Sequence, residues 1–459
     1  MKFQKYKNKK IYFLGIGGIS MYALALLMES KVAYVFGYDK VKSETTEVLS
    51  DKGIPVYYEP SINNSFGADI CVCTAAIGES DEEFQNVLKN NIPIIYRGEF
   101  LGEIIDCFDN SIGISGTHGK STTSGILSEI YLADKEKNPT ILMGAILPSI
   151  DSAYYLGNAK DLIFEACEYK DSFLSFRPKT SVILNVRLDH TDYFSDLDRM
   201  KESFVKYASS SEQVVVNMDS PDALECAKKS GKRVITYSIN SDKADCYPSD
   251  ISIKREKTTF VLNYKEKAIA ECEIFIPGEH NFSNALAAAT AALACGISID
   301  SVVQGLRNFR GIKRRFEFLG KVNGAHIYDD YAHHPDEVLS TLKAAETLGF
   351  KKIVCVFQPH TYTRLSDFFD DFSKIFGERC ENDNFECIFL PTYAAREKNT
   401  LGYDTEKLSN NVKNSIFINS LDNAAEYIMK NANDNEMYIL MGAGDVNQIS
   451  KKLLFDVEK

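Results

Sequence analysis

The stretch Gly116-Thr-His-Gly-Lys-Ser-Thr122 decides the fold of this chain. It follows a strand-like apolar run at residues 112–115 and precedes an amphipathic helical pattern that includes residues 126–131. A glycine-rich turn between a strand and a helix exposes backbone N–H groups and directs a helix N-terminus at one point, which suits a polyphosphate. Lys120 adds a charge for the outer phosphates, and Ser121 adds a hydroxyl for a magnesium ion. The stretch therefore predicts an α/β domain that uses ATP.

The spacing of the two glycines is shorter than in the full GxxxxGK[ST] loop. A purely structural strand-to-helix turn is therefore the alternative. Lys120 and Ser121 directly after the second glycine favour the phosphate-binding interpretation.

The composition is that of an ordinary globular protein, with 459 residues, 44% hydrophobic residues and a net charge of −12. This length predicts two to four domains. The absence of a long basic run argues against a nucleic-acid partner. No apolar stretch reaches the roughly 18 residues that span a bilayer, and no signal peptide is visible, so we expect no membrane insertion. The eleven cysteines include no paired CxxC, which favours reduced thiols and a cytoplasmic location.

Three blocks of alternating strand-like and helix-like segments predict α/β domains with mainly parallel sheets. The expected domains are residues 1–107, 108–309 and 310–459. The expected strands are residues 11–14, 32–38, 70–73, 93–96, 112–115, 162–164, 181–186, 214–216, 234–237, 326–328, 353–357, 387–390 and 438–441. Short polar–apolar alternation in residues 242–277 predicts an antiparallel insertion or edge.

Two polar motifs follow apolar strands in the same block as the loop. They are Glu165-Ala-Cys-Glu168 and Leu188-Asp-His190-Thr-Asp192. Carboxylate and imidazole groups at neighbouring strand ends would complete an oxygen-rich magnesium site that begins at Ser121. Histidine is an unusual magnesium ligand, so manganese is a possible substitute. Helix caps and surface loops are the alternative for each motif alone.

Further motifs combine amide, guanidinium, phenol and imidazole groups. In His280-Asn-Phe-Ser-Asn284 the amides are either helix caps or groups that bind a purine edge. Arg314-Arg315 is either a solvated hinge or a phosphate contact. Asp329-Asp-Tyr-Ala-His-His334 and Gln358-Pro-His-Thr-Tyr-Thr-Arg364 both end apolar strands and have the groups that hold a zwitterion such as an amino acid.

Together these residues resemble the Mur ligase family, over nearly the whole chain. The resemblance is strongest to the members that join L-alanine to UDP-N-acetylmuramate. The matching segments, in order, are Gly15-Ile-Gly-Gly18, Gly116-Thr-His-Gly-Lys120, Glu165-Ala-x-Glu168, Asp189-His190-x-Asp192, His280-Asn-x-x-Asn284, Arg314-Arg-Phe-Glu317, Asp329-Asp-Tyr-x-His-His-Pro335, Phe357-Gln-Pro-His360 and Gly442-Ala-Gly-Asp445.

The resemblance implies an α/β architecture of three domains. These are an N-terminal Rossmann-like domain for the UDP-sugar, a central phosphate-loop domain for ATP and a C-terminal Rossmann-like domain for the amino acid. It implies that ATP, with Mg²⁺ or Mn²⁺, phosphorylates the carboxylate of UDP-N-acetylmuramate. The amine of L-alanine then displaces phosphate to form an amide, in peptidoglycan precursor synthesis.

The resemblance also implies roles for individual residues. The ATP contacts are Gly116, Thr117, His118, Gly119, Lys120, Ser121, Thr122, His280, Asn281, Asn284, Arg315 and Asp330. The metal ligands are Ser121, Glu165 and His190. The UDP-sugar contacts are Gly15, Gly17, Gly18, Asp39 and Arg97. The amino-acid contacts are Tyr331, His333, His360 and Arg364. The catalytic set is Lys120, Glu165, His190, His333 and Arg364.

The chain departs from the family pattern at four positions. Ser121 replaces a threonine, Cys167 an aspartate and Tyr169 a serine, and Thr361 stands where the family usually has an arginine. The last change leaves open a related ligase that adds a different amino acid or a peptide. The changes at Cys167, Tyr169 and Thr361 leave open a non-catalytic ATP-binding paralogue.

A dinucleotide-dependent oxidoreductase is the remaining alternative. Gly15-x-Gly-Gly after a strand, with Asp39 ending the next strand, imitates a Rossmann fingerprint. Ser20 stands where the third glycine belongs, and an oxidoreductase leaves the phosphate loop unexplained.

Overall fold

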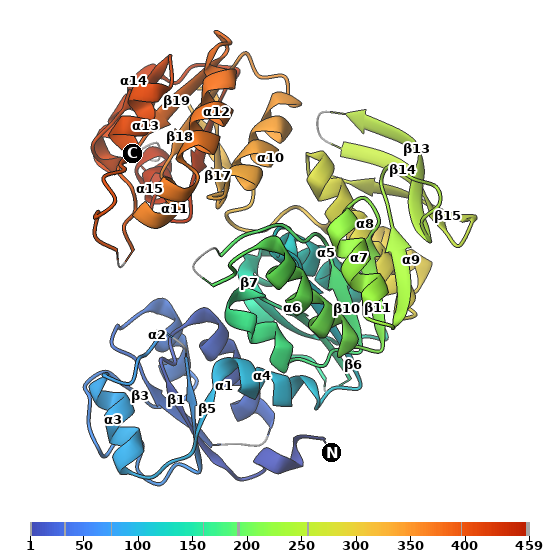
Figure 1. Cartoon of the computed structure of the whole chain (residues 1–459), viewed down its shortest axis with the longest axis vertical. Helices are drawn as coiled ribbons and strands as arrows, with labels where there is room; N and C mark the ends of the chain where they lie inside the picture. Colours follow the sequence, from blue (N-terminus) through green and yellow to red (C-terminus); the bar gives the residue numbers. More distant parts are fainter. Residues whose placement is uncertain are drawn as a thin grey trace. The chain divides into compact units, whose positions relative to one another are not determined.

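The computed structural model contains three β-sheets, of five, ten and six strands (Figure 1). It describes residues 2–31, 34–74, 76–158, 160–190, 193–254, 257–395 and 397–455. The chain divides into two compact units, each treated by itself below. The first unit comprises Met1–Ile251, Thr259–Glu273 and Ser283–Phe309. The second comprises Ser252–Thr258, Ile274–Phe282 and Arg310–Lys459.

The first sheet is parallel throughout, in the order β3-β2-β1-β4-β5. Its strands are β1 (Lys10–Leu14), β2 (Tyr34–Tyr38), β3 (Val56–Tyr57), β4 (Ile70–Cys73) and β5 (Ile94–Tyr96). The helices of this region are η1 (Lys2–Tyr6), α1 (Ile19–Lys31), α2 (Glu44–Asp51), α3 (Glu82–Lys89) and α4 (Arg97–Ile105). The chain order reverses beside β1, and the glycine turn follows this strand, at the point where open α/β sheets bind ligands.

The second sheet has the order β15-β14-β13-β12-β11-β10-β6-β9-β7-β8. Its strands are β6 (Asn110–Ser115), β7 (Thr140–Leu147), β8 (Ser152–Tyr155), β9 (Asp161–Glu165), β10 (Thr180–Ile183), β11 (Gln213–Asn217), β12 (Arg233–Tyr237), β13 (Cys246–Lys254), β14 (Lys257–Tyr264) and β15 (Lys267–Ile274). Strand β6 runs parallel to both of its neighbours, β9 and β10. The carboxyl ends of these three strands therefore meet at one edge, where β6 leads into the phosphate loop.

Among the described residues, seven helical segments accompany the second sheet; the first five connect its strands, and the last two follow β15. They are α5 (Lys120–Ala133), η2 (Pro148–Ile150), η3 (Tyr169–Ser175), α6 (Leu197–Ser209), α7 (Pro221–Lys229), α8 (Glu279–Ala294) and α9 (Ile299–Asn308). Helix α9 packs tightly on α5, because a Cβ on Gly305 would overlap the Cα of Ile130. This close contact fixes the helix that carries the phosphate loop.

The third sheet has the order β16-β17-β21-β18-β19-β20, and only β16 is antiparallel to its neighbour. Its strands are β16 (Glu317–Val322), β17 (Ala325–Asp330), β18 (Lys352–Phe357), β19 (Phe385–Phe389), β20 (Ser415–Phe417) and β21 (Glu436–Met441). Its helices are α10 (Pro335–Glu346), α11 (Tyr362–Asp367), α12 (Phe369–Cys380), α13 (Thr405–Asn411), α14 (Leu421–Asn431) and α15 (Gln448–Phe455). Asp330 and Phe357 are both level with Met441, so the ends of β17, β21 and β18 are aligned.

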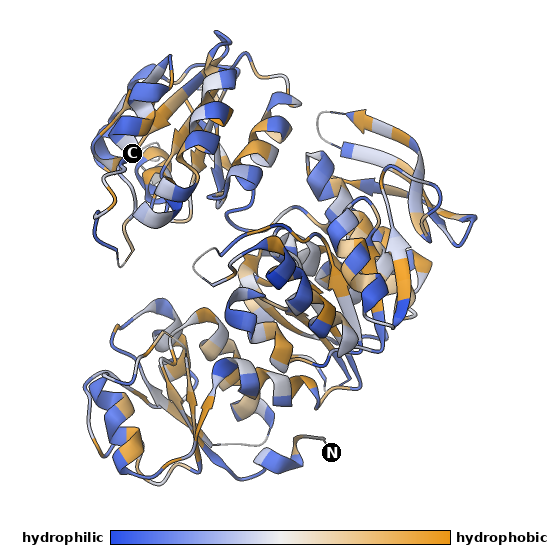
Figure 2. Cartoon of the chain, in the orientation of Figure 1, coloured by the Kyte–Doolittle hydropathy of each residue, from blue (hydrophilic) through white to orange (hydrophobic). Residues whose placement is uncertain are grey.

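The hydropathy pattern explains these layers, since the central strands are apolar and the outward helix faces are polar (Figure 2). Every strand predicted from the sequence is present, although residues 32 and 33 lie outside the described part. One predicted strand is too long, because the run at 181–186 ends as β10 at Ile183. Strands β3, β7, β8, β16 and β20 were not predicted. None of the helices in the described residues combines the length and the apolar character that a membrane-spanning helix needs.

Candidate functional site: the phosphate loop and the amino-acid face

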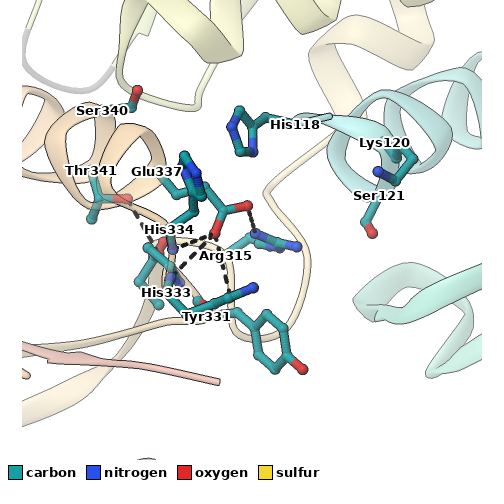
Figure 3. Close-up of polar contacts among 12 residues, drawn as sticks. His118, Lys120, Ser121, Arg315, Tyr331, His333, His334, Glu337, Ser340 and Thr341 are labelled. Atoms are coloured by element: carbon teal, nitrogen blue, oxygen red, sulfur yellow. Dashed lines mark hydrogen bonds and ion pairs between the residues drawn. The ribbon is translucent and has the colours of Figure 1, made fainter. Parts of the chain in front are cut away.

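The phosphate loop connects β6 to α5 through two glycines with left-handed backbone. Gly116 has φ +137°, and Gly119, the N-cap of α5, has φ +88° and ψ −5°. A residue with a Cβ is strained at such angles. The turn thus places Lys120 and Ser121 in the first turn of α5 (Figure 3). The N–H groups of a first helical turn have no partner within the helix and are free to bind an anion.

The segment after β10 holds the backbone of the loop from the side. The Asn185 amide donates to His118 O at 3.0 Å and accepts from His118 N–H at 2.9 Å. The Thr117 hydroxyl donates to Arg187 O at 3.0 Å and accepts from Arg187 N–H at 2.9 Å. Four hydrogen bonds therefore fix two successive loop residues, which keeps the loop in one conformation.

The Lys120 ammonium lies among oxygen acceptors. Its Nζ donates to Gly116 O at 2.6 Å and to Thr117 O at 3.2 Å. It also lies 3.0 and 3.2 Å from the two carboxylate oxygens of Glu168. Burial is the largest single influence and opposes the charge of Lys120, but the neighbouring groups, led by the Glu168 carboxylate, together outweigh it and raise the lysine pKa. Lys120 is therefore a fixed cation at the mouth of the loop.

The Ser121 side chain contacts Glu165, the first glutamate of the Glu165-Ala-Cys-Glu168 motif. The Ser121 hydroxyl donates to Glu165 Oε2 at 3.1 Å, and the N–H of Gly144, on β7, donates to Glu165 Oε1 at 2.7 Å. A hydroxyl beside a carboxylate offers the hard oxygen ligands that Mg²⁺ prefers. The donor set of Ser121 and Glu165 thus fits the predicted metal ion.

His190 lies next to the Lys120–Glu168 pair. Its Nε2 is 3.8 Å from Glu168 Oε1 and 3.9 Å from Asp189 Oδ2. The Tyr169 ring contacts the imidazole at a centroid distance of 4.6 Å. His190 has a left-handed backbone with φ +53°, which is unusual for a residue other than glycine. The rest of the predicted motif, Thr191 and Asp192, lies outside the described residues.

The predicted nucleotide contacts on α8 fall in both units. In the first unit, Asn284 reaches the loop, since its Oδ1 would be 2.5 Å from a Cβ on Gly119. In the second unit, His280 and Asn281 lie in the first turn of α8. The Asn281 amide donates to Pro277 O at 2.7 Å. One of its two donors is therefore used locally, but this is not an N-cap bond, in which the side-chain oxygen accepts a backbone N–H.

The glycine turn after β1 is occupied by an acidic side chain. Gly17 N–H donates to Asp39 Oδ2 at 2.9 Å, and a Cβ on Gly17 would touch that carboxylate. Arg97, the first residue of α4, donates to the Ser20 hydroxyl at 3.2 Å. Three of the predicted UDP-sugar contacts, together with the neighbouring Gly15 and Gly18, thus lie around one turn.

In the second unit, Asp330 ends β17 and is fully enclosed. It accepts hydrogen bonds from Phe316 N–H at 2.7 Å, Ala332 N–H at 2.8 Å and the Thr341 hydroxyl at 3.2 Å. Burial raises the pKa of Asp330 to about 6, against the opposing charge of Arg315. These contacts fix the start of the polar loop that follows.

Glu337 organises the loop between β17 and α10 (Figure 3). Its carboxylate lies 3.7 Å from Arg315 Nη1 and 3.4 Å from His333 Nδ1, and it accepts from the N–H of His333 at 3.2 Å. The Arg315 guanidinium also lies 5.3 Å from the centre of the Tyr331 ring. Sequence reasoning missed Glu337, because an acid in a first helical turn usually serves only the helix terminus.

Tyr331, His333, His360 and Arg364 come together as predicted. The ring of His333 lies 5.4 Å from Tyr331 and 6.0 Å from His360. Burial, and then the Arg364 guanidinium, lower the pKa of His360, and the same charge acts on His333. Burial lowers the pKa of His333 to about 4, so its ring is neutral at neutral pH. His333 Nδ1 lies 3.0 Å from Tyr331 O, which assigns the proton to Nδ1 and leaves Nε2 as an acceptor.

Thr361 follows His360 in a strained conformation, with φ +65° and ψ 148°. Its hydroxyl caps α11 through Arg364 N–H at 3.4 Å, and its own N–H donates to Tyr393 O at 2.9 Å. The Tyr393 ring stacks on His360 at 5.7 Å. Tyr393 was not predicted, although it stands shortly after the strand expected at residues 387–390.

Arg314 serves the fold of the second unit. Its guanidinium donates to Gly442 O at 2.8 Å and Gly444 O at 3.2 Å, and lies 3.4 Å from Asp329. Gln358 Nε2 donates to Asp445 Oδ1 at 2.8 Å. These contacts explain the Gly442-Ala-Gly-Asp445 motif as a support beneath the ends of β18 and β21.

Three sheets with strand-end polar loops, one of them a phosphate loop, define an α/β nucleotide-using protein. Family models match residues 10–108 as "Mur ligase family, catalytic domain", 114–292 as "Mur ligase middle domain" and 314–444 as "Mur ligase, glutamate ligase domain". The chain belongs to the Mur ligase family.

Curated relatives match over their full length. A UDP-N-acetylmuramate–L-alanine ligase of Agathobacter rectalis is 38% identical, with 97% of each chain covered. One of Clostridium novyi is 37% identical, with 98% of each covered. Among solved structures, the UDP-N-acetylmuramate–alanine ligase of Thermotoga maritima has a TM-score of 0.81 at 25% identity and covers 98% of this chain and 99% of its own. A murein peptide ligase of Psychrobacter arcticus shares the fold, with a TM-score of 0.70 at 22% identity and 98% of each chain covered.

Proposed function

We propose that this protein is an ATP-dependent ligase that forms an amide between the carboxylate of UDP-N-acetylmuramate and L-alanine. This reaction belongs to peptidoglycan precursor synthesis, in the cytoplasm. The observation that carries the proposal lies at the start of α5. The Lys120 ammonium contacts the Glu168 carboxylate there, and the Ser121 hydroxyl contacts the Glu165 carboxylate. We assign the first pair to the phosphates of ATP and the second pair to the metal ion. The relatives named above, which match the whole chain, support the choice of substrates.

The first step activates a carboxylate, which is a poor electrophile at neutral pH. A carboxylate oxygen of the sugar attacks the γ-phosphorus of ATP, the bond to the β-phosphate oxygen breaks, and ADP leaves. Lys120 and the N–H groups at the start of α5 stabilise the charge on the transferring phosphoryl group. The loop conformation held by Asn185 and Thr117 keeps these donors in place before ATP arrives.

Ser121 and Glu165 would hold a magnesium ion, with His190 as a further ligand that suits manganese better. When bound, this ion neutralises phosphate charge. Glu165 is the better of the two glutamates for this role, because its carboxylate already faces the Ser121 hydroxyl. Gly144 N–H orients that carboxylate from β7.

The second step joins the amine to the acyl phosphate. The amine nitrogen attacks the acyl carbon, a tetrahedral intermediate forms, phosphate leaves, and the nitrogen loses a proton. The neutral His333 ring offers Nε2 as a hydrogen-bond acceptor for this amine, and Arg364 offers a guanidinium for the carboxylate of the amino acid. Arg315 and Asp330 are the proposed ATP contacts of the second unit.

The proposed domains are residues 1–107, 108–309 and 310–459, one for each sheet. The glycine turn after β1, with Asp39 and Arg97, is the proposed UDP-sugar site. A related ligase that adds another amino acid or a peptide is the second candidate. Thr361 favours it, because this position lacks the arginine expected beside the amino-acid carboxylate.

Phosphate release tests the proposal directly. Purified protein is incubated with ATP, Mg²⁺, UDP-N-acetylmuramate and single amino acids or peptides. Alanine-dependent release is expected, whereas release with another acceptor alone points to the related ligase. ATP binding without release for any acceptor would overturn the proposed activity.

The matched variants are Lys120→Ala and Lys137→Ala. Lys120→Ala is expected to abolish turnover and to preserve UDP-sugar binding, because Lys120 acts on phosphate. Lys137 lies 3.6 Å from the buried Asp161 and is not part of the site, so Lys137→Ala is expected to lower stability and to leave the turnover of the folded protein unchanged. Equal turnover in both variants would contradict the role of Lys120.

A further inference from the structure

We propose that Glu168 is a positioning residue for Lys120, which holds the lysine ammonium at the phosphate loop and does not bind the metal ion. The inference rests on the proposed function, since it assigns a role within the same site. It gives different roles to Glu165 and Glu168, which lie three residues apart and which the sequence alone does not distinguish.

The first argument is the number of acceptors around the ammonium. A lysine ammonium has three protons to donate. Gly116 O, Thr117 O and the two Glu168 oxygens already surround Lys120 Nζ within 3.2 Å. A phosphate oxygen must therefore replace one of these acceptors. The loop carbonyls are the partners that can be exchanged, because they are neutral.

The second argument is burial. The Glu168 side chain has no exposed surface, and that of Lys120 is 17% exposed. A buried carboxylate that loses its cation is left uncompensated, which is strongly unfavourable. His190 Nε2, at 3.8 Å, is the next group with a possible positive charge. Lys120 is therefore confined to positions within reach of Glu168, and this restraint directs it to the loop mouth.

The third argument is how the backbone directs Glu168. It is the N-cap of η3, and two residues inside η3, Lys170 and Asp171, have left-handed backbone with φ 53° and 56°. Asp171 is fixed there by the Tyr193 hydroxyl at 2.8 Å and by Arg199 Nη2 at 2.6 Å. This bend turns Glu168 toward Lys120, whereas Glu165, at the end of β9, faces Ser121.

The restraint predicts a split between ATP affinity and turnover. Glu168→Gln removes a negative charge beside the phosphate site, so ATP should bind equally well or more tightly. The ammonium loses its charged anchor, and misplacement of a catalytic group by about 1 Å costs about 100-fold in rate. Turnover should therefore fall by about 100-fold without a rise in the Kd of ATP. General damage to the fold would weaken both.

The test measures three quantities on the full-length wild type, Glu168→Gln, Glu168→Asp and Glu165→Gln. These are kcat, the Kd of a non-hydrolysable ATP analogue by calorimetry, and the Kd of Mn²⁺ by electron paramagnetic resonance in the presence of ADP. Glu83→Gln is the matched control, since Glu83 is equally buried and hydrogen-bonded to Tyr12 and Ser61 in the first sheet region. It should leave nucleotide affinity unchanged.

The expected result is a low kcat with unchanged Mn²⁺ affinity in Glu168→Gln, partial recovery in Glu168→Asp, and weakened Mn²⁺ binding only in Glu165→Gln. Loss of Mn²⁺ affinity in Glu168→Gln would make it a metal ligand and overturn the inference. Unchanged kcat would overturn it as well. If the wild type shows no turnover, the proposed function has failed. The role of Glu168 as a positioning residue is then tested by binding alone, and a higher Kd of the ATP analogue for Glu168→Gln would refute it.

Discussion

Replacement of Asn185 tests whether the phosphate loop is held ready for ATP. The Asn185 side chain makes two hydrogen bonds to the backbone of His118, at 2.9 and 3.0 Å. Asn185→Ala removes both. Each such neutral bond contributes about 1 kcal/mol net, so the ordered loop loses about 2 kcal/mol.

The loss should appear as weaker ATP binding. In the variant the loop must be ordered when ATP binds, and the binding free energy decreases by the cost of ordering. A change of about 2 kcal/mol corresponds to roughly 30-fold in Kd. Calorimetric titration with a non-hydrolysable ATP analogue and Mg²⁺ measures it. Asn185→Asp should bind more weakly still, because a carboxylate oxygen then faces His118 O and adds negative charge near the phosphates.

Asn263→Ala is the matched control. Asn263, on β14, also makes two hydrogen bonds with its amide, to Ser249 Oγ at 3.0 Å and Val261 O at 3.2 Å. Its replacement should lower stability by a similar amount and leave the Kd of the analogue within about twofold of wild type. An Asn185→Ala protein that also stays within twofold would refute preorganisation by this side chain.

Three further predictions concern helix packing at Gly102, the titration of His333 and the amino-acid contact at Thr361. A Cβ on Gly102, in α4, would overlap the Ser175 carbonyl oxygen, so Gly102→Ala should cost about 1–3 kcal/mol in urea unfolding. Gly377, in α12, has open space around it, so Gly377→Ala should raise the free energy of unfolding by up to about 1 kcal/mol. Equal effects of Gly102→Ala and Gly377→Ala would contradict the close approach of Gly102 to Ser175. Between pH 6.5 and about pH 4 the unfolded chain binds more protons at His333 than the folded chain, so stability falls as pH falls through this window. His333→Gln should flatten that part of the urea-midpoint profile, and an unchanged profile would argue against a buried neutral ring. Thr361→Arg should lower the KM for L-alanine without loss of kcat, and an unchanged KM would show that Arg364 is sufficient.

The contact between Ser121 and Glu165 could be predicted because it depends on topology alone. Each of these residues follows an apolar strand, and carboxyl ends of parallel strands meet at one edge. The position of Asn185 could not be predicted in this way. The apolar run continues past it, so the sequence pattern placed it inside a strand, whereas β10 ends two residues earlier at Ile183.

The separate roles of Glu165 and Glu168 depend on local backbone geometry. Lys170 and Asp171 have left-handed backbone conformations, which residues other than glycine rarely adopt. No sequence pattern predicts these conformations. The same holds for Thr361 at φ +65°. Such positions persist only when surrounding contacts impose them. Residue types at a site can therefore be read from sequence, while the partner of each side chain requires the structure.

Two of the departures from the family pattern remove a charge, since Cys167 replaces an aspartate and Thr361 an arginine, whereas Lys120, Glu165 and His190 follow the pattern. Cys167 lies near Lys120, and burial and then the Glu168 charge raise the pKa of its thiol, so it is neutral at neutral pH. Tyr169 places its ring on His190 and adds no charge. A non-catalytic paralogue would be expected to lose a member of the phosphate and metal groups. Lys120, Ser121, Glu165 and His190 are all present in this chain, which favours an active enzyme.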